Sequence, residues 1–492
     1  MITVIHQTTF RPALPNTYGA SDYRDYRDLL AQIDANLLIS GLECELVEVA
    51  LRRWVNASKN PPSEKQKDRK RAELRYGLRC NIGRCLTGES YRQFSIHLSD
   101  SALLQWFTGI HYFEARKAAS KSSLERYGKL FKVEEIEMAV ERMLSSAADA
   151  QMAPALGLNQ RIEIDEIFSD CTCVKANIHF PVDWVLLRDA VRVLIAGIKL
   201  IRKHGLKHRI PEPSTFLKRV NTLSIEMTHA RRRADSKRVR KRVLRLQKDL
   251  VKTVEKHAVR YVNLLKDRWE ETDWSKAQAQ QVLNRMEGVL QKLPAAKKQA
   301  HERIIGERRV PNQDKILSLH EEDIHILVRG KAGAEVEFGN GCYLAEQADG
   351  LIVDWQFFKD QPPADSKLVE ESIARIESKY GSIGSFTADR GFDSTANAAL
   401  LKEKEIYNGI CPKNPAVLAE RLEERRFENL QSRRAQTEGR IGIFKNVYLG
   451  SPLRSKGFIH RELSVAWCVL SHNLWVVARM ALANERQQAQ AA

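Results

Sequence analysis

The pattern of the sequence changes at the segment Ile162-Glu-Ile-Asp-Glu-Ile-Phe-Ser-Asp170-Cys-Thr-Cys173. Apolar and β-branched side chains alternate with polar ones there, which is typical of a β-strand. We expect this strand to begin at residue 162 and to end at Asp170. Cys171 and Cys173 alternate around Thr172, which favours neighbouring strand residues over a metal site.

The residues before this strand are expected to be helical, from residue 24 to residue 150. Apolar side chains recur there at helical spacing, for example at Leu29, Ile33 and Leu37. A charged loop is expected from Asn56 to Lys70, where two prolines occur. Residues 1–155 are therefore predicted to form a helical N-terminal domain.

A second helical part is expected after the strand, at about residues 184–310. One face of its first helix carries an apolar stripe of Trp184, Leu187, Val191, Leu194, Ile198 and Ile201. Asp183 directly precedes this stripe and is expected to cap the helix. Breaks are expected near Pro211, Pro213 and Pro294.

Strands and helices alternate beyond residue 334. The sequence predicts a hairpin of Ala334–Leu344 and Leu351–Phe358, followed by helices at 366–380 and 394–404 and strands at 385–388 and 406–411. A hairpin followed by crossover helices implies a mixed sheet with helices on its faces. We expect an α/β domain over residues 160–483, interrupted by the helical insertion and followed by a polar tail at 484–492.

The charge of the chain indicates a polyanionic partner. Its 492 residues carry a formal net charge of +17, and its sequence pI is about 9.5. Such a surplus attracts nucleic acid, because binding phosphates releases their condensed counterions. The composition of 43% hydrophobic and 29% charged residues is that of a globular protein, and its length predicts more than one core.

The most basic part of the insertion runs from residue 231 to residue 245, with nine Lys or Arg against the single Asp235. So many charges of one sign are unfavourable on a helix without counter-charges, which favours a DNA-facing surface over a solvated face. The residues expected to contact DNA are Arg231, Arg232, Arg233, Lys237, Arg238, Arg240, Lys241 and Arg242.

The remaining patterns predict a cytoplasmic protein. The eight cysteines lack the spacing of a zinc site, and residues 1–15 lack the features of a signal peptide. The apolar segment Leu463–Ala483 is interrupted by polar residues, so we expect a buried helix and no membrane partner. The chain lacks a glycine-rich phosphate loop of the G-x4-G-K-[ST] kind, so ATP is not implied.

Three acidic residues are the candidates for chemistry. Asp170 is expected at the end of the first strand, and Asp389 follows a later strand in Phe386-Thr-Ala-Asp-Arg-Gly-Phe-Asp-Ser394. Carboxylates at strand ends converge where a sheet opens. Glu438 is expected on a helix whose same face carries Arg434 and Lys445.

Such a set of carboxylates can serve phosphodiester chemistry. Mg²⁺, or alternatively Mn²⁺, takes oxygen ligands, and two ions about 4 Å apart can act on the attacking and leaving oxygens. Asp165 is an alternative to Asp170 as the first ligand. Arg434 and Lys445 could instead be simple ion-pair partners of Glu438. Asp393 and Ser394 are expected to cap the following helix.

In this order, the motifs resemble those of bacterial insertion-sequence transposases of the DDE type. Arg434, Glu438 and Lys445 match a Tyr-x2-Arg-x3-Glu-x6-Lys signature, with Gln431 in place of the tyrosine. The segment 388–394 is similar to Ala-Asp-Arg/Lys-Gly-Tyr-Asp-Ser, and Asp170-Cys-Thr resembles Asp-Ser-Thr. Residues 40–110 resemble the helical N-terminal domain of these enzymes.

The resemblance implies an RNase H-like catalytic domain that cleaves and transfers DNA strands with two metal ions at Asp170, Asp389 and Glu438. Arg390, Arg434 and Lys445 would then contact phosphates of double-stranded DNA, and a homodimer or larger assembly would hold the two element ends. The alternatives are an RNase H-like host nuclease or resolvase without strand transfer, and a non-catalytic DNA-binding protein derived from a transposase.

Overall fold

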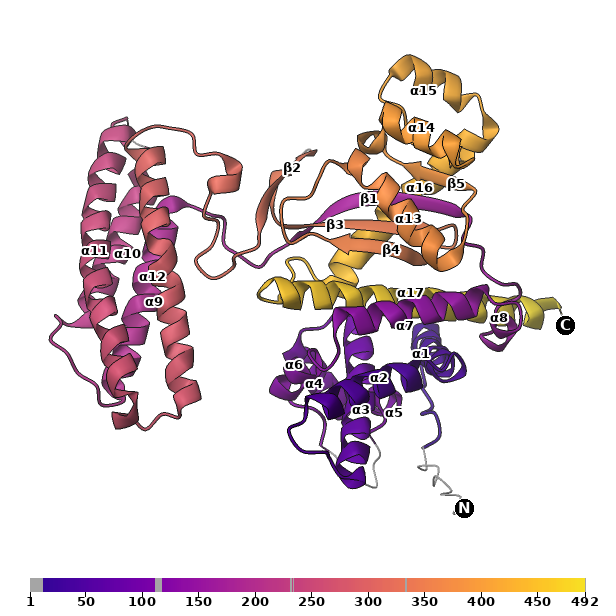
Figure 1. Ribbon diagram of the computed structural model, residues 1–492, viewed down its shortest axis with the longest axis horizontal. Helices are drawn as coiled ribbons and strands as arrows, with labels where there is room; N and C mark the ends of the chain where they lie inside the picture. The colour runs from indigo at the N-terminus through magenta and orange to yellow at the C-terminus, as the bar shows by residue number, and fades with distance from the viewer. Residues whose placement is uncertain (1–11, 111–116, 231, 233, 332–333, 492) are drawn as a thin grey trace. The chain divides into compact units, whose positions relative to one another are not determined.

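The computed structural model describes residues 12–110, 117–230, 232, 234–331 and 334–491 (Figure 1). The chain forms two compact units. The first combines Met1–Ala176 with Asn340–Ala492, and the second is Asn177–Gly339.

The N-terminal part of the first unit is helical, as predicted. Its helices are α1 (Ser21–Ile39), α2 (Leu42–Ala57), α3 (Glu64–Thr87), α4 (Tyr91–Asp100), α5 (Ala102–Thr108), α6 (Lys121–Tyr127), α7 (Val133–Ala148) and α8 (Met152–Ala155). The predicted loop over 56–70 is wrong in its second half, because α3 begins at Glu64. The Ser63 hydroxyl accepts from the Gln66 amide, and the Gln66 side chain accepts from the Ser63 amide, so a capping box starts the helix there.

The sheet of the first unit is mixed, and its hairpin lies where the sequence predicts it. Its strands are β1 (Glu166–Lys175), β3 (Ala334–Gln347, in this unit from residue 340 on), β4 (Ile352–Phe357), β5 (Ser385–Ala388) and β6 (Tyr407–Asn408). The order is β4-β3-β1-β5-β6. β3 and β4 are antiparallel, whereas β1 and β6 both run parallel to β5. β6 is shorter than predicted.

The predicted end of the first strand at Asp170 is wrong. β1 begins at Glu166 and continues to Lys175, so Asp170 lies in its middle. The alternation of polar and small apolar residues continues through Cys171, and Thr172 and Cys173 are buried in the sheet. Because the strand lies between β3 and β5, hydrogen bonding extends it beyond the apolar segment that marks it in the sequence.

Helices accompany this sheet, as the mixed α/β prediction requires. They are α13 (Val369–Tyr380), α14 (Thr395–Glu403), α15 (Pro415–Leu422), α16 (Arg425–Ile443), the π-helix η6 (Phe444–Leu449) and α17 (Phe458–Ala491), with short 3-10 turns η4 (Asp365–Lys367) and η5 (Arg390–Phe392). Ser394 caps α14, as expected, by accepting from the Asn397 amide. Asp393 does not cap it and accepts from the Lys413 amide instead.

α17 forms much of the core of the first unit and packs against α1, α3 and α7 (Figure 1). It is long and apolar enough to span a membrane by composition, but 78% of its most apolar 18-residue window is buried within the protein. This burial accounts for its apolar side chains, and one such helix is weak evidence for a membrane span.

The second unit contains the predicted long helical insertion after β1. Its elements are α9 (Asp183–Lys203), α10 (Pro213–Ala230), α11 (Ser236–Arg268), η2 (Trp269–Glu271), α12 (Lys276–Ile304), η3 (Asn312–Asp314) and β2 (His325–Lys331). The four long helices pack around one apolar core. β2 was not predicted, and it pairs antiparallel with the first part of β3.

Two local predictions for this unit are wrong. Pro294 does not break α12, which runs through it. The neighbouring Leu293 and Ala296 are buried against the other helices, and this packing offsets the missing backbone donor. Asp183 does not cap α9 but is its buried first residue, and it accepts hydrogen bonds from Gln299 and Arg303 of α12.

Candidate active site

β1 and β5 place Asp170 and Asp389 side by side. The two strands are parallel, and their last paired residues are Ser169 and Ala388. Asp170 and Asp389 occupy the next position in this register, and neighbouring strands lie about 4.8 Å apart. Asp170 Oδ1 accepts from the Cys171 amide at 2.7 Å, and Asp389 Oδ1 accepts from the Gly391 amide at 2.8 Å. Both carboxylates are partly exposed.

The face of β1 that carries Asp170 is the face along which α16 runs. Side chains alternate along a strand, so Asp170 shares its face with Phe168 and Thr172. The Arg433 guanidinium of α16 lies 4.5 Å from the centre of the Phe168 ring. Farther along the same chain segment, Lys445 Nζ of η6 donates to Thr172 Oγ1 at 3.0 Å.

These two contacts indicate how far along β1 the position of Glu438 lies. Glu438 lies five residues after Arg433, which is about 7.5 Å along a helix. Asp170 lies two residues after Phe168, which is about 6.6 Å along a strand. The helix and the strand run in the same direction here, because Lys445 reaches Thr172. Glu438 is therefore level with Asp170, on the helix that covers it.

Glu438 itself is bound by a neighbour on its own helix. Its side chain is 61% exposed and accepts from Arg434 Nη1 at 3.2 Å. Arg434 Nε donates to Gln431 Oε1, and Gln431 Nε2 donates to the Gly409 carbonyl at 2.6 Å. Gln431, at the tyrosine position of the signature, thus ties α16 to the chain after β6. Arg434 is an ion-pair partner of Glu438, whereas Lys445 contacts the strand.

These side chains offer only part of the oxygen ligands that a cation such as Mg²⁺ needs. Asp170 and Asp389 offer adjacent carboxylates, and Mg²⁺ is commonly held by one or two carboxylates together with water and substrate phosphates. In the described part of the chain, however, no three His, Cys, Asp or Glu side chains lie close enough to hold a metal ion. The meeting of all three predicted acids around two ions stays a prediction.

A further acid lies beside this pair that the sequence interpretation missed. Asp365 Oδ2 of η4 and Asp389 Oδ1 both lie 2.9 Å from the place where a Cβ on Gly391 would be. Burial raises the pKa of the Cys171 thiol, and the nearby charges of Asp365 and Asp170 raise it further. Asp365 precedes a predicted helix and stands in no motif, so only the fold reveals its position.

Asp165, the alternative first ligand, lies at the opposite end of the strands. Its carboxylate fills the space beside Gly384, directly before β5. Its carbonyl accepts from the Gly384 and Ser385 amides. Asp389 lies at the far end of β5, so Asp165 does not belong to the same site.

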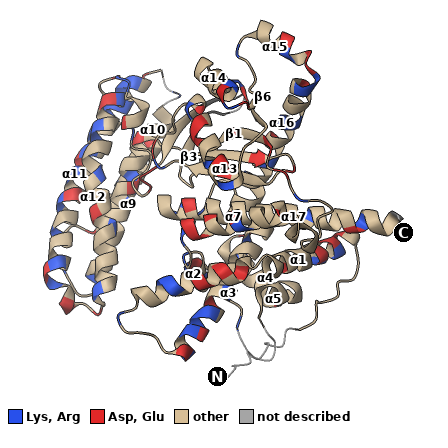
Figure 2. Ribbon diagram, turned by 45° about the vertical axis from the view of Figure 1, so that its right-hand side comes forward, with Lys and Arg blue, Asp and Glu red and all other residues tan. Residues whose placement is uncertain are grey.

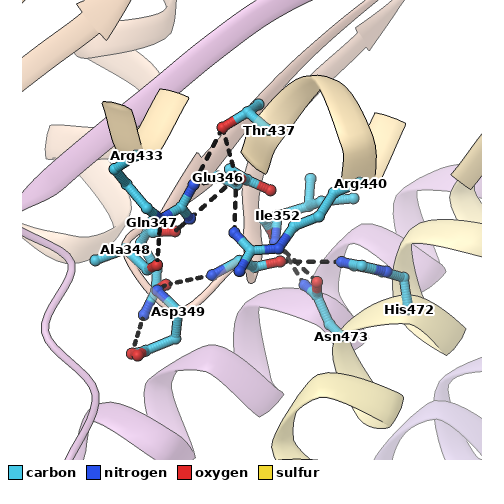
Figure 3. Close-up of polar contacts among 11 residues, drawn as sticks. Glu346, Gln347, Ala348, Asp349, Ile352, Arg433, Thr437, Arg440, His472 and Asn473 are labelled. Carbon is cyan, nitrogen blue, oxygen red and sulfur yellow. Dashed lines mark hydrogen bonds and ion pairs between the residues drawn. The ribbon is translucent and has the colours of Figure 1, made fainter. Parts of the chain in front are cut away.

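A buried ionic network fixes α16 on the sheet (Figure 3). Glu346, near the end of β3, is 4% exposed, and its Oε1 accepts from Arg433 at 3.0 Å, Thr437 at 2.7 Å and Arg440 at 3.0 Å. Burial lowers the pKa of Arg433, and the charge of Glu346 opposes this shift. Glu438 lies one residue after Thr437, so this network positions the third candidate acid.

The turn between β3 and β4, which follows Glu346 in the chain, is held in place by hydrogen bonds from α17. His472 Nε2 donates to the Gly350 carbonyl at 2.9 Å, and Asn473 pairs with both backbone groups of Ile352 (Figure 3). All these residues come from the first unit. α16, which carries Glu438, is therefore held against the β3–β4 hairpin, and the hairpin is held against α17 in the core of the unit.

Counter-charges accompany the basic segment 231–245, contrary to the premise of the sequence interpretation. Lys237 and Lys241 both pair with Glu307, Arg238 pairs with Asp235, and Arg242 pairs with Glu226. The guanidinium of Arg240 lies over the Trp184 ring. Acidic and basic residues lie side by side along α11 and α12 (Figure 2). Glu226 and Glu307 lie outside residues 231–245, and Asp235 lies three residues before its partner Arg238. The composition of the segment therefore could not show these ion pairs.

Two members of the predicted DNA-contacting set, Arg231 and Arg233, lie outside the described residues. Arg232 precedes α11 and is exposed, and Arg390 is exposed at the start of η5, next to Asp389. The role of these cations in DNA binding stays a prediction. Exposed ion pairs contribute little to stability, so their cations remain able to exchange a carboxylate for a phosphate.

Comparison of the chain with known protein families, curated proteins and solved structures gave no match.

Proposed function

We propose that the chain is a DDE transposase with an RNase H-like catalytic core, which cleaves DNA strands and joins them to a target. The proposal is supported mainly by the register of β1 and β5, in which Asp170 and Asp389 directly follow the last pair of residues, Ser169 and Ala388. It is also supported by the contacts of α16 and η6 with β1, because α16 carries Glu438. The order of these acids in the chain and the net charge of +17 agree with it.

The proposed reaction consists of two in-line displacements at phosphorus. In the first, water attacks the phosphodiester and a 3′ hydroxyl leaves. In the second, this hydroxyl attacks a phosphodiester of the target strand. Mg²⁺ or Mn²⁺ held by Asp170, Asp389 and Glu438, as two ions, would supply charge neutralisation and lower the pKa of the attacking oxygen.

The chain itself positions the strands. Lys445 contacts Thr172, two residues after Asp170, Arg390 directly follows Asp389, and Arg434 is paired with Glu438. Cations at these places stabilise charge on the transferring phosphate and fix the register of the backbone without reading its sequence. The N-terminal helices would recognise the element ends in double-stranded DNA, within a homodimer or larger assembly in the cytoplasm.

One alternative has an observation of its own. Glu438 is bound to Arg434, and the described residues form no three-acid metal cluster. A non-catalytic DNA-binding protein that kept the acids as remnants would show the same arrangement. An RNase H-like nuclease or resolvase is the second alternative, and it differs only in lacking the joining step.

A cleavage and joining assay separates these functions. Full-length protein is incubated with Mg²⁺ and DNA that carries the sequences flanking its coding region. Asp170→Asn, Asp389→Asn and Glu438→Gln are each expected to lower cleavage by at least about 100-fold, as expected when a group acts on the transition state. DNA binding should stay within about twofold, because few phosphate contacts change.

The matched control is Glu428→Gln, which removes an exposed carboxylate from the first turn of the same helix. It should cleave like the unaltered protein. Cleavage without joined products would assign a nuclease instead. Binding without cleavage in either metal would assign the non-catalytic protein.

A further inference from the structure

A basic cavity lies in the first unit, between the N-terminal helices and the segment that follows α16. Its volume is about 650 Å³. Its walls come from the end of α3, the start of α4, α6 with the residues that follow it, η6, the segment 450–456 and the first half of α17. The side chains that matter most for what it can bind are Arg84, Tyr91, Arg454, Lys456 and Trp467.

Two hydrogen-bond donors in the cavity wall have no acceptor. Arg84 Nε and Trp467 Nε1 are buried and make no hydrogen bond with the described residues. Both groups can only donate. Trp467 is 2% exposed, whereas Arg84 is partly exposed, so Arg84 is the residue of the two that a ligand in the cavity can contact. A guanidinium with an unsatisfied donor favours a ligand rich in acceptor atoms.

The cavity is also short of negative charge. Six Lys or Arg line it among the described residues, against the two acids Glu89 and Glu125. Glu125 is paired with Lys121. The guanidinium of Arg84 lies 4.9 Å from the centre of the Tyr91 ring. No ion pair joins Arg84 to any described carboxylate. The same is true, within the described residues, of the rim cations Arg92, Lys129, Arg454 and Lys456.

The cavity is connected to the candidate active site through one short segment. Lys445 of η6 contacts Thr172 of β1, and Tyr448, three residues later, lines the cavity. The Leu453 amide then donates to the Lys175 carbonyl at the end of β1, at 2.9 Å. A π-helix such as η6 is often found at a functional site.

We infer that this cavity binds a phosphate group, and that the phosphate belongs to a DNA strand on its way to Asp170 and Asp389. Phosphate oxygens would accept from the Arg84 guanidinium, and the rim cations would neutralise the neighbouring phosphates. Tyr91 offers an aromatic face at the same place. Naming DNA as the source rests on the proposed function, whereas the phosphate chemistry does not.

The test measures binding in EDTA, so that no cleavage occurs. Fluorescence anisotropy is recorded with labelled single-stranded and duplex oligonucleotides and the full-length protein. Arg84→Met, which keeps an unbranched apolar stem and removes the charged guanidinium, is expected to weaken binding about tenfold and to reduce the salt slope by about one. Arg84→Lys, which keeps the positive charge, should bind the oligonucleotides nearly as tightly as the unaltered protein.

Arg69→Met is the matched control, since Arg69 is exposed on the same helix and outside the cavity. It should change binding by less than about twofold, in line with the loss of one peripheral charge. The double variant Arg454→Met/Lys456→Met alters only exposed rim residues and reports on the cavity if Arg84→Met fails to fold. Circular dichroism checks the fold of each variant.

Competition distinguishes the sources of the phosphate. Inorganic phosphate or a mononucleotide that displaces the oligonucleotide from the unaltered protein, and less so from the rim variant, would indicate a free nucleotide site. Oligonucleotide binding that depends on Arg84 without such competition supports the DNA strand. Unchanged binding in the rim variant and in folded Arg84→Met would overturn the inference. Absence of cleavage by the unaltered protein would count against the proposed function alone.

Discussion

His472 is buried in α17 in a form that cannot easily take up a proton. Its Nε2 donates to the Gly350 carbonyl, and its Nδ1 is buried without a hydrogen-bond partner among the described residues. Burial lowers the pKa of His472, and the nearby charge of Arg440 lowers it further, although the Gly350 carbonyl and Glu346 oppose the shift. The neutral imidazole is therefore the form that the folded protein binds best.

This burial predicts a loss of stability in weak acid. A histidine in the unfolded chain takes up a proton near pH 6.5, whereas the folded protein resists it, so the free energy of unfolding decreases as the pH falls below about 6.5. His472→Gln, which keeps a donor for Gly350, should flatten this part of the profile. Urea unfolding at pH 7, 6 and 5 measures it.

His460→Gln is the control for this profile, because His460 lies on the same helix but is partly exposed. It should leave the slope unchanged. Equal slopes in the unaltered protein and His472→Gln would show that His472 contributes nothing to the pH dependence.

Single residues were predictable where their chemistry is local. Asp389 and Ser394 follow a short strand and precede a helix, and the structure has them in those places. Asp183 was not predictable, because its partners Gln299 and Arg303 lie more than 100 residues away in the chain. A local capping pattern cannot show such a partner.

At the scale of elements, the position of α16 depends on Glu346. Its buried carboxylate neutralises Arg433 and Arg440, whose side chains are 16% and 27% exposed. Glu346→Gln would leave two largely buried guanidiniums without a counter-charge. Breaking a buried ion pair costs about 3–5 kcal/mol, and we expect the lower end because Arg440 is partly exposed.

The same change should also lower DNA cleavage, since α16 carries Glu438. Urea unfolding and the cleavage assay measure the two effects. Glu377→Gln is the control, because it breaks the more exposed pair with Lys404 and should cost less than about 1 kcal/mol. An unfolding free energy for Glu346→Gln equal to that of the control would refute the role of this network.

The elements themselves were predictable to different degrees. The β3–β4 hairpin and α9 carry clear period-2 and period-3.6 patterns, and both form. β2 was missed because its pairing with β3 is decided by tertiary structure. The start of α3 at Glu64 was missed because the capping box at Ser63 lies among charged residues and two prolines.

At the scale of the whole molecule, the net charge of +17 is spread over both units and is partly compensated in each (Figure 2). The composition correctly excludes a disordered chain, but it could not show which cations are paired. The cations of 237–242 have acidic partners, whereas the rim of the cavity in the first unit has few. We therefore place the stronger phosphate-binding surface in the unit that also holds Asp170 and Asp389.

The proposed strand cleavage and transfer require Asp170, Asp389 and Glu438 to share bound cations. Fe²⁺ substituted for Mg²⁺ reduces added hydrogen peroxide to hydroxyl radicals, with ascorbate returning Fe³⁺ to Fe²⁺. These radicals cut the nearest backbone, so mapping the cuts by mass spectrometry locates the ion. With DNA bound, we predict cuts near residues 170, 389 and 438, all suppressed by excess Mg²⁺ and by Asp170→Asn. Cuts that avoid these three places, or that occur near 170 and 389 but never near 438, would contradict the account.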